Sequence, residues 1–583
     1  MSDMENEIRQ LLLDIDVEDD DEHVEFSDDN MEIDSEEDDE MSASDCEEEE
    51  ISETRHHEGV LLGKKGFRWT VQPHSSSGRT ASRNIVLKVP GCKDAAKFVK
   101  SEVEAWDLLF DSTILETIVF NTNIEIGVQR QNSASTSSST STAASTSKYN
   151  GDTNIDEIRA LIGLLYIAGV QKQSRRAIKY MWSINCSPIF QAIMGQNRFE
   201  FLTNCIRFDD RETRDRADKL SPIRLIWEKF CFNSTKYYTP HEYCTIDEQL
   251  LGFRGNCPFR IYIPSKPDKY GIKIITMCDS RTYYMVSAIP YIGKEIRISN
   301  DPIPLQIVKK LTESIHGTGR NLTMDNWFTS IQLVEEMLSR HKLTVVGTLR
   351  KNKAEIPPLF LPNRKKEILS SQFAFKDKMT LVAFTPKKGK GVVLISSLHK
   401  GKTVDPQSKK PEIINFYNST KGGVDTFDQL VHTYSVARKT RRWPLRYFFG
   451  MLDQAGINSM VLYNLGNNYK NKKQKRSIFL HNLGFFLAKP YMKKRLDQKI
   501  SIHLRTNIVK IFMNASGEAH EVIDKDEGQE PPSKKAKQGR CFLCPRMKDK
   551  KTKTVCKTCD RHICAEHRME ICTSCKFLAK KNA

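Results

Sequence analysis

Residues 243–249 read Tyr-Cys-Thr-Ile-Asp-Glu-Gln, a β-branched and aromatic run that ends in acids. Residues 321–327, Asn-Leu-Thr-Met-Asp-Asn-Trp, follow a similar plan, and residues 422–429, Gly-Gly-Val-Asp-Thr-Phe-Asp-Gln, open a helical pattern. We expect a strand ending at Asp247, another followed directly by Asp325, and a helix with Asp425 and Asp428 on one face. Brought together, these four carboxylates would form an oxygen-rich cluster of the kind that suits Mg²⁺.

A single aspartate beside a turn is usually a cap or a solvated loop residue, so no one of the four carries the argument alone. Several carboxylates in one place repel one another unless a cation neutralises them. Two Mg²⁺ ions can stabilise both the attacking and the leaving oxygen of a phosphoryl transfer. The cluster therefore predicts metal-dependent chemistry at a phosphodiester.

The pattern around these acids predicts a mixed α/β sheet. Strands are expected at 243–247, 270–277, 282–289, 321–324 and 343–348, with helices between the last three. Residues 351–415 interrupt this order with prolines and predict a small β-rich insert with strands at 379–384 and 391–396. Helical periodicity at 153–207, and again from 424 to about 500, flanks the sheet.

Charge divides the 583-residue chain into two parts. Residues 1–58 contain 27 Asp and Glu against Arg9 and Arg55, a net charge of −25, and the remainder carries 87 Lys and Arg against 47 Asp and Glu, a net charge of +40. The acidic head is not expected to fold alone, and regular structure is expected to begin near residue 93. An excess of positive charge on the folded part predicts a polyanionic partner such as DNA, the alternative being a soluble basic surface.

The longest apolar run, residues 160–170, is too short to span a bilayer, so no membrane partner is expected. Residues 132–147 are almost all Ser, Thr and Ala and predict a flexible insertion. A cluster of lysines at 534–537 is typical of nuclear import, the alternative being a solvated charge run. We therefore expect a nuclear protein.

Several long stretches resemble the piggyBac transposase family, in particular its insect-type member. They are residues 245–255, 258–273 (Pro-Phe-Arg-Ile-Tyr-Ile-Pro-Ser-Lys-Pro-Asp-Lys-Tyr-Gly-Ile-Lys), 325–330 (Asp-Asn-Trp-Phe-Thr-Ser), 421–429 and 438–444 (Arg-Lys-Thr-Arg-Arg-Trp-Pro). By position, Asp247, Asp325 and Asp425 match the family's metal-binding triad, and Asp428 matches its fourth required acid. The resemblance implies a homodimeric cut-and-paste transposase that binds terminal inverted repeats, cuts through hairpin ends and integrates at TTAA sites. It implies two Mg²⁺ ions per active site, with Mn²⁺ as a substitute, and no small-molecule substrate.

The resemblance also implies a domain plan, with a ribonuclease-H-like core interrupted by an insertion and flanked by a split helical domain. The expected parts are a disordered acidic region (1–92), a dimerisation and DNA-binding domain (93–242 and 435–515), the catalytic core (243–350 and 416–434), the insertion domain (351–415), a linker (516–540) and a zinc domain (541–583).

Basic and aromatic residues near the acidic motifs are candidate DNA contacts, because guanidiniums bind phosphates and an indole stacks on an unpaired base. By resemblance, Arg350 and Lys353 approach the target or flanking backbone. The other candidates are Arg254, Lys269, Arg438, Lys439, Arg442 and Trp443. For the last four the alternative is a packed Trp443 and a solvated basic helix face.

The C-terminal tail contains eight metal-binding side chains in two-residue knuckles, enough for two tetrahedral Zn²⁺ sites. The crowded middle favours an interleaved, cross-brace arrangement. One ion would be held by Cys541, Cys544, Cys564 and His567, and the other by Cys556, Cys559, Cys572 and Cys575. His562 is the alternative to His567. The family's Cys-rich domain matches this pattern, which implies binding to the terminal inverted repeat.

Three functions are thus distinguished. An active transposase is favoured, because a protein that only binds DNA has no physical need for four crowded acids. A domesticated relative that binds DNA without cutting it is the second. The third is a chromatin or ubiquitin adaptor that uses only the zinc tail, for which a RING or histone-reading finger fits the spacing less well.

Overall fold

The computed structural model describes residues 59–73, 85–136, 149–264, 266, 268–293, 300–466, 474–515, 538–548, 550–555 and 561–567. The chain divides into two compact units, Met1–Ile508 and Val509–Ala583, which are considered separately. The acidic head, most of the Ser/Thr-rich insertion and the lysine cluster of the linker lie outside the described residues. No described helix is both long enough and apolar enough to cross a membrane.

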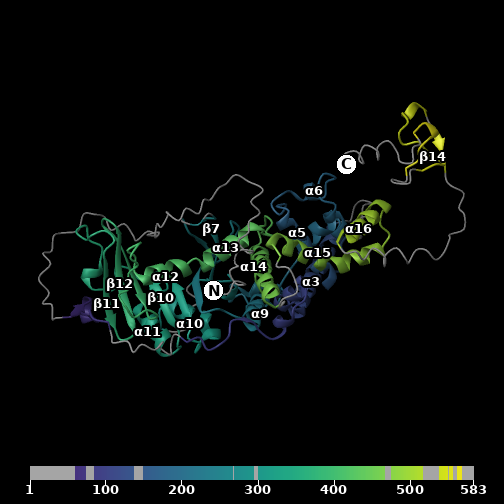
Figure 1. Cartoon of the computed structure of the whole chain (residues 1–583). Helices are drawn as coiled ribbons and strands as arrows, with labels where there is room; N and C mark the ends of the chain where they lie inside the picture. The colour runs from purple at the N-terminus through teal and green to yellow at the C-terminus, as the bar shows by residue number, and fades with distance from the viewer. Residues whose placement is uncertain are drawn as a thin grey trace. The chain divides into compact units, whose positions relative to one another are not determined.

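One mixed sheet runs through the first unit (Figure 1). Its strands in spatial order are β1 (Val60–Leu62), β2 (Arg68–Thr70), β11 (Ser371–Lys376), β12 (Met379–Lys387), β13 (Lys390–Ser396), β10 (Thr344–Thr348), β9 (Asn321–Met324), β5 (Tyr243–Gly252), β7 (Tyr270–Asp279) and β6 (Arg260–Tyr262), and β8 (Met285–Pro290) also pairs with β7. Strands β5, β9 and β10 are parallel, whereas β7 and β8 are antiparallel to their neighbours. The predicted mixed α/β layer is confirmed.

Four of the described helices belong to the sheet region, of which the first two alternate with strands β8, β9 and β10. They are α10 (Ile303–Thr312), α11 (Ile331–Ser339), α12 (Glu412–Thr420) and α13 (Gly423–Thr433). Of the apolar residues at helical spacing in the first two, Ile307, Val308, Ile331 and Val334 are buried. These helices form because their apolar residues recur at helical spacing and are buried.

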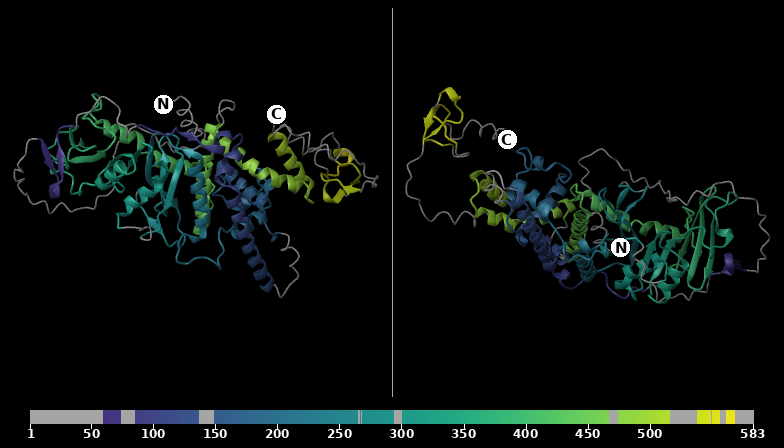
Figure 2. Two further views of the ribbon diagram at one scale, coloured as in Figure 1. Left: turned by 90° about the horizontal axis from the view of Figure 1, so that it is seen from below. Right: turned by 180° about the vertical axis from the view of Figure 1, so that it is seen from behind.

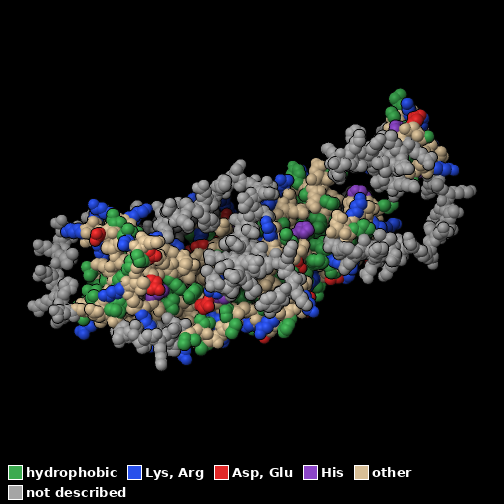
Figure 3. Space-filling view, viewed as in Figure 1, with side chains coloured by type: hydrophobic (Ala, Val, Ile, Leu, Met, Phe, Trp, Pro, Cys, Tyr) green, Lys and Arg blue, Asp and Glu red, His purple; other side chains and the backbone are tan. Residues whose placement is uncertain are grey.

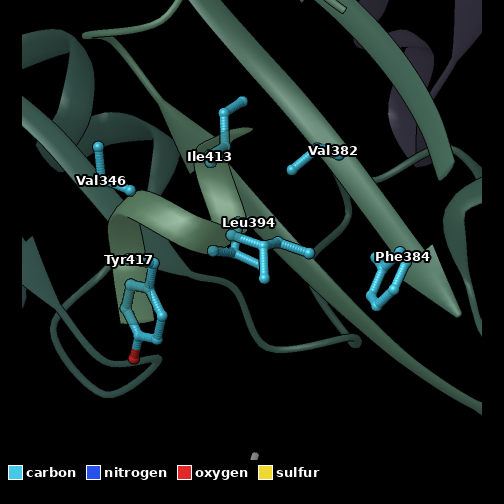
Figure 4. Packing of buried hydrophobic residues seen from close by; sticks show 7 residues of the cluster. Val346, Val382, Phe384, Leu394, Ile413 and Tyr417 are labelled. Atoms are coloured by element: carbon cyan, nitrogen blue, oxygen red, sulfur yellow. The ribbon is translucent and has the colours of Figure 1, made fainter. Parts of the chain in front are cut away.

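The insertion strands β11, β12 and β13 continue the sheet, because β13 pairs antiparallel with β10. Buried Val346, Val382, Leu394 and Ile413 form one hydrophobic cluster across β10, β12, β13 and α12 (Figure 4). The predicted insert strands at 379–384 and 391–396 are present as β12 and β13, and β11 is a further strand of the insert that was not predicted. Strand β6, outside the insert, was not predicted either. Strand pairing over long sequence separation, which local patterns do not encode, makes the insert an extension of the central sheet.

Regular structure begins before residue 93, so that prediction, and with it the extent 1–92 of the disordered region, is wrong for the described residues 59–73. Strands β1 and β2 form a hairpin, and Thr70 of β2 pairs with Phe375 of β11. The indole of Trp69 is fully buried and donates its Nε1–H to the Glu355 carbonyl at 2.8 Å. The hairpin folds because the sheet supplies the apolar surface and backbone partners that the short segment lacks.

Helices from two distant chain segments pack beside the sheet. They are α2 (Glu102–Leu109), α3 (Ser112–Thr136), α5 (Ile155–Val170), α6 (Ile178–Met181), α7 (Ile189–Ile193), α8 (Gln196–Cys205), α9 (Ser221–Tyr237), α14 (Trp443–Gly466) and α15 (Arg476–Leu496), with a short β3 (Gly91–Cys92) and β4 (Tyr238–Thr239) pair. Helix α16 (Ile502–Ala515) spans the boundary between the two units. Helices α5 and α15 cross where a methyl group on Gly163 would lie 2.3 Å from the Gly484 carbonyl oxygen. The prediction of a flexible insertion from residue 132 is wrong for residues 132–136, because α3 extends to Thr136 and points away from its neighbours (Figure 2, left).

Helix α14 fastens this helical region to the sheet. Asn458 bonds the backbone of Met285 in β8 in both directions, at 2.9 Å each. A methyl group on Gly450 would meet the Leu251 side chain of β5 at 2.7 Å, so helix and strand are in close contact. The sheet region and the helical region therefore share one core.

Candidate active site

The sheet register places Asp247 and Asp325 side by side. Strands β5 and β9 pair in parallel as far as Ile246 and Met324, so the two aspartates are the next residues on neighbouring strands. The prediction that Asp247 ends its strand is wrong, because β5 continues to Gly252. Its pairing with β7 extends along the whole strand, and this outweighs the polarity of Asp247, Glu248 and Gln249. Asp247 instead marks the point where the parallel partner stops.

Helix α13 brings the other two acids to the same edge. Its first residue, Gly423, lies so close to β5 that a methyl group there would be 2.5 Å from Thr245 Oγ1. The Thr245 hydroxyl donates to the Thr420 carbonyl at 2.6 Å, and the Thr420 and Thr323 hydroxyls lie 2.8 Å apart. The small Gly423 and the threonine hydroxyl contacts thus let the junction of α12 and α13 pack directly against β5 and β9. Asp425 lies in the first turn of α13.

The opposite end of α13 is also held in place. Asp453 of α14 accepts hydrogen bonds from the Ser435 hydroxyl at 2.7 Å and the Val436 N–H at 2.8 Å. Burial raises the pKa of Asp453 to about 7. The buried Arg476 donates to the Leu430 carbonyl at 3.0 Å, near the C-terminus of the helix, where a positive charge is favourable. Fixing both ends of α13 orients the two acids that it carries.

The acids interact electrostatically. The pKa of Asp247 is raised well above its usual value, first by burial and then by the neighbouring carboxylates of Asp425, Glu248 and Asp325. Burial also raises the pKa of Asp428, whose Oδ1 is buried without a hydrogen-bond partner. Among the described residues these acids do not form a set of three with oxygens all within 4.8 Å of one another. The arrangement is therefore a loose cluster of acids, whose nearest basic groups are Lys266, 3.4 Å from Asp425, and His432, 3.7 Å from Asp428.

Asp325 is also the first residue of a turn. Its Oδ1 accepts the backbone N–H groups of Trp327 at 3.0 Å and Phe328 at 3.3 Å. This is the local role that a lone aspartate commonly has. The turn holds the carboxylate at the end of β9, so the cap and the cluster are compatible.

Lys266 is a site residue that sequence reasoning missed. It lies in the loop between β6 and β7, and its Nζ is 3.4 Å from Asp425 Oδ1. Its pKa is raised: burial, the largest influence, acts to lower it but is outweighed by Asp425, Asp247, Asp428 and Glu248. The signal was its position between Pro264 and Pro267, where ring-constrained backbone favours a fixed loop. A cation thus lies where the acids would otherwise repel one another.

The predicted DNA contacts divide by exposure. Arg254, Lys269, Arg350 and Lys439 are exposed, and Lys353 is half-buried. Arg438 donates to the Arg176 carbonyl at 2.9 Å, and Arg442 donates to the carbonyls of Asn204, at 2.9 Å, and Ile206. Burial lowers the pKa of Arg442 to about 10.

Trp443 is half-buried and packs edge-on against Phe259, with ring centroids 5.0 Å apart. Arg438, Arg442 and Trp443 therefore have packing roles within the chain. The DNA-binding role of the whole set stays a prediction.

The second unit contains β14 (Gly539–Arg540), β15 (Lys551–Thr552) and the side chains predicted for one zinc site. Ligand atoms of Cys541, Cys544, Cys564 and His567 all lie within 4.8 Å of one another. The His567 Nδ1 is 3.3 Å from Cys564 Sγ and 3.6 Å from both other sulfurs. Three thiols and an imidazole at this spacing match the soft ligand set of a structural zinc site.

His562, the alternative ligand, lies elsewhere. A methyl group on Gly539 would be 1.9 Å from the His562 ring, so the ring packs against the β14 backbone. The structure thus groups His567 with the three cysteines. The predicted second site, Cys556, Cys559, Cys572 and Cys575, lies outside the described residues.

Comparison with known proteins identifies transposases and proteins derived from transposable elements as relatives. Residues 101–460 match a family model described as Transposase IS4. Human PiggyBac transposable element-derived protein 3 is 24% identical over 421 residues, which are 68% of this chain and 65% of that protein. The human chimeric ERCC6-PGBD3 protein is also 24% identical over 421 residues, 68% of this chain and 36% of that protein. The chain therefore spans less than two thirds of the length of these two curated relatives.

Among solved structures, the chain is similar to that in the cryo-EM structure of a piggyBac transposase synaptic complex with hairpin DNA. The TM-score is 0.72 with 37% sequence identity, over 84% of this chain and 100% of that chain. The family match extends over more than half of the sequence and includes all four acids. The chain therefore belongs to the piggyBac-type transposase family.

Proposed function

We propose that the protein is an active cut-and-paste DNA transposase. In this proposal it binds the terminal inverted repeats of its element, cuts them through hairpin ends and joins the element to TTAA sites. The observation that carries it is the convergence of Asp247, Asp325 and Asp425, from three distant segments, at one edge of the sheet. The likeness to a transposase solved with hairpin DNA supports the substrate class.

The arrangement of strands supports a ribonuclease-H-like core. Three parallel strands, β5, β9 and β10, adjoin antiparallel β7 and β8 in the order β8-β7-β5-β9-β10. The acids lie where parallel β5 and β9 stop pairing, and ligands of open α/β sheets commonly bind at carboxyl ends of strands.

The donor set fits divalent metal. Asp247, Asp325 and Asp425 would hold two Mg²⁺ ions, or Mn²⁺, with Asp428 as the fourth acid. Carboxylate oxygens are the ligands that Mg²⁺ prefers. Burial is the main cause of the raised pKa of Asp247, and the neighbouring carboxylates, whose charge a dication would neutralise, raise it further. When bound, the ions stabilise the attacking and leaving oxygens of an in-line displacement at phosphorus.

The chain's own residues supply position and charge. The fixed ends of α13 keep Asp425 and Asp428 turned toward β5, and Lys266 limits repulsion before metal binds. Each proposed step has the same form. Water attacks first and leaves a 3′-OH, which attacks the opposite strand to form the hairpin. Water opens the hairpin, and the 3′-OH then attacks target DNA. One arrangement of acids can therefore serve every step.

Further parts of the proposal concern partners. The Cys541, Cys544, Cys564 and His567 grouping would hold Zn²⁺ in a unit that contacts the terminal inverted repeat, with a second Zn²⁺ held nearby. The exposed members of the predicted basic set, such as Arg254 and Arg350, would contact DNA phosphates. The protein would act as a homodimer in the nucleus.

The second candidate is a transposon-derived protein that binds DNA without cutting it. It is favoured by the likeness to a human protein whose name describes it as derived from a transposable element. Retention of all four acids in this chain favours the first candidate, because crowded carboxylates are costly without a metal-binding role.

The test is a nicking and hairpin assay on a duplex carrying the inverted repeats that flank the coding sequence, with Mg²⁺ or Mn²⁺ present. We expect Asp247→Asn to reduce cleavage to background while DNA binding persists. Asp377→Asn, an exposed aspartate in the turn between β11 and β12, is the matched control and should cleave normally. Full cleavage by Asp247→Asn would remove the triad assignment. Wild-type binding without cleavage would establish the second candidate.

A further inference from the structure

The turn between β12 and β13 carries three lysines in four residues, Lys387-Lys388-Gly389-Lys390. All three are exposed, and so are Arg364 and Lys365 of the preceding loop. We refer to these five basic residues as the basic tip. Figure 3 shows Lys and Arg side chains along the margin of the insertion, at the end of the view where Figure 1 labels β11 and β12.

Backbone geometry fixes the basic tip. Lys387 and Lys390 are paired across the hairpin, and Gly389 has a φ of +74°, which favours glycine. A methyl group on Gly389 would lie 3.4 Å from Arg364 Cγ, so the loop that carries Arg364 packs against the turn. The five charges therefore belong to one ordered feature.

The strand register places the basic tip beyond the same ends of the strands as the acids, that is, beyond the carboxyl ends of β9 and β10. Gly347 of β10 pairs with both Met324 of β9 and Ile395 of β13. From that level β9 leads directly to Asp325, while β13 runs five residues in the same direction to Lys390. At about 3.4 Å per residue and about 4.8 Å per strand interval, the backbone of Lys390 lies roughly 17 Å from that of Asp325. That span corresponds to about five base pairs of duplex DNA.

The surrounding charge favours a polyanion. Residues 351–415 contain 14 Lys and Arg against 5 Asp and Glu. Among the described ion pairs, none involves the five residues of the basic tip. Glu367 is the nearest acid along the chain and is exposed. Cations fixed on a hairpin and lacking acidic partners are suited to phosphate contacts that do not depend on base sequence.

We propose that the basic tip is a second contact for double-stranded DNA, which holds the backbone of the duplex about half a helical turn from the phosphate at the acids. This inference rests on the proposed function. It adds a surface that none of the motifs behind that function includes. Its role is to fix the direction in which the duplex leaves the active site, because two separated contacts define an axis and one does not.

The experiment compares two triple variants of the full chain by the salt dependence of binding to a random-sequence 40-base-pair duplex in Ca²⁺. The tip variant is Lys387→Gln, Lys388→Gln and Lys390→Gln. The control is Lys342→Gln, Lys378→Gln and Lys402→Gln. It removes the same charge at the opposite ends of β10, β12 and β13. Equal melting temperatures for both variants and wild type establish that the fold is intact.

We expect the tip variant to bind roughly tenfold more weakly at 100 mM salt, with the slope of log K against log salt smaller by about 1 to 3, while the control changes little. Equal slopes for the two variants would overturn the inference and leave the proposed function intact. Wild-type protein that binds the duplex but never cleaves repeats in Mg²⁺ would overturn the proposed function alone. A tip variant that loses affinity only for a peptide of residues 1–58 would overturn DNA as the occupant.

Discussion

At the scale of single residues, Lys266 shows how the acids coexist before metal binds. Its Nζ lies 3.4 Å from Asp425 Oδ1, and its side chain is only 20% exposed, whereas that of Asp425 is 61% exposed. A cation bound by the acids must therefore compete with an ammonium already present. Because the Lys266–Asp425 pair is partly exposed, solvent screens the repulsion between the ammonium and a bound cation. This repulsion should weaken metal binding by about 1 kcal/mol.

Lys266→Met should accordingly bind Mn²⁺ about fivefold more tightly than wild type in the absence of DNA, measured by calorimetric titration. Lys266→Arg keeps the charge and should retain wild-type affinity. Lys269→Met is the matched control, because it removes an exposed charge three residues away. Equal gains in Lys266→Met and Lys269→Met would show that only overall charge matters, and no gain in either would contradict the competition.

At the scale of elements, the hairpin of β1 and β2 is where local sequence was least informative. Its strands have three residues each, and the segment directly follows the acidic head. By contrast, β9 was predicted at its observed bounds, because Asn-Leu-Thr-Met alternates polar and apolar residues and is followed directly by Asp-Asn. The end of β5 was misplaced because Asp247 and Glu248 resemble a turn until β7 pairs with them. Long-range pairing, which no local window contains, decides each difference.

The hairpin should contribute to the stability of the insertion through Trp69. This side chain is fully buried, with a relative exposure of 0%. Trp69→Ala should therefore destabilise this region by about 3 to 5 kcal/mol, the usual cost of removing a buried aromatic side chain. Hydrogen exchange of the β11 amides measures the effect.

Leu62→Ala is the control in the same hairpin, because Leu62 is 46% exposed. Its substitution should change β11 exchange by less than about 1 kcal/mol. If Trp69→Ala left the hydrogen-exchange protection of β11 at the wild-type level, the hairpin would not contribute to the stability of the sheet.

At the scale of the whole molecule, the sequence predicted which acids lie near one another better than it predicted the continuity of the sheet. The resemblance gave the acids and the division into core and insertion, and the acids meet at one edge as expected. One sheet nevertheless runs from β1 to β6 through both parts, so the basic tip and the acids share a rigid frame. Lys266 and the basic tip escaped prediction because their relation to the acids depends on register and loop packing, not on spacing along the chain.

The second unit should depend on metal while the first does not. Its described part contains two-residue strands and the cluster of Cys541, Cys544, Cys564 and His567, so little apolar surface is available to stabilise it. Binding of structural zinc supplies on the order of 10 kcal/mol to such small folds. Chelation should therefore abolish hydrogen-exchange protection at 538–567 and leave the melting transition of the sheet region unchanged.

Cys564→Ser should also abolish hydrogen-exchange protection in this unit, without chelator. It should lower the zinc content by at least one ion per chain, measured by mass spectrometry. Cys186→Ser, which alters a half-buried cysteine of the first unit, is the control and should keep wild-type zinc. The physical reason is that a serine hydroxyl is a poor zinc ligand, whereas Cys186 is no part of the cluster. Wild-type protein that contains no zinc, or a Cys564→Ser variant with full zinc, would show that this unit is held by other interactions.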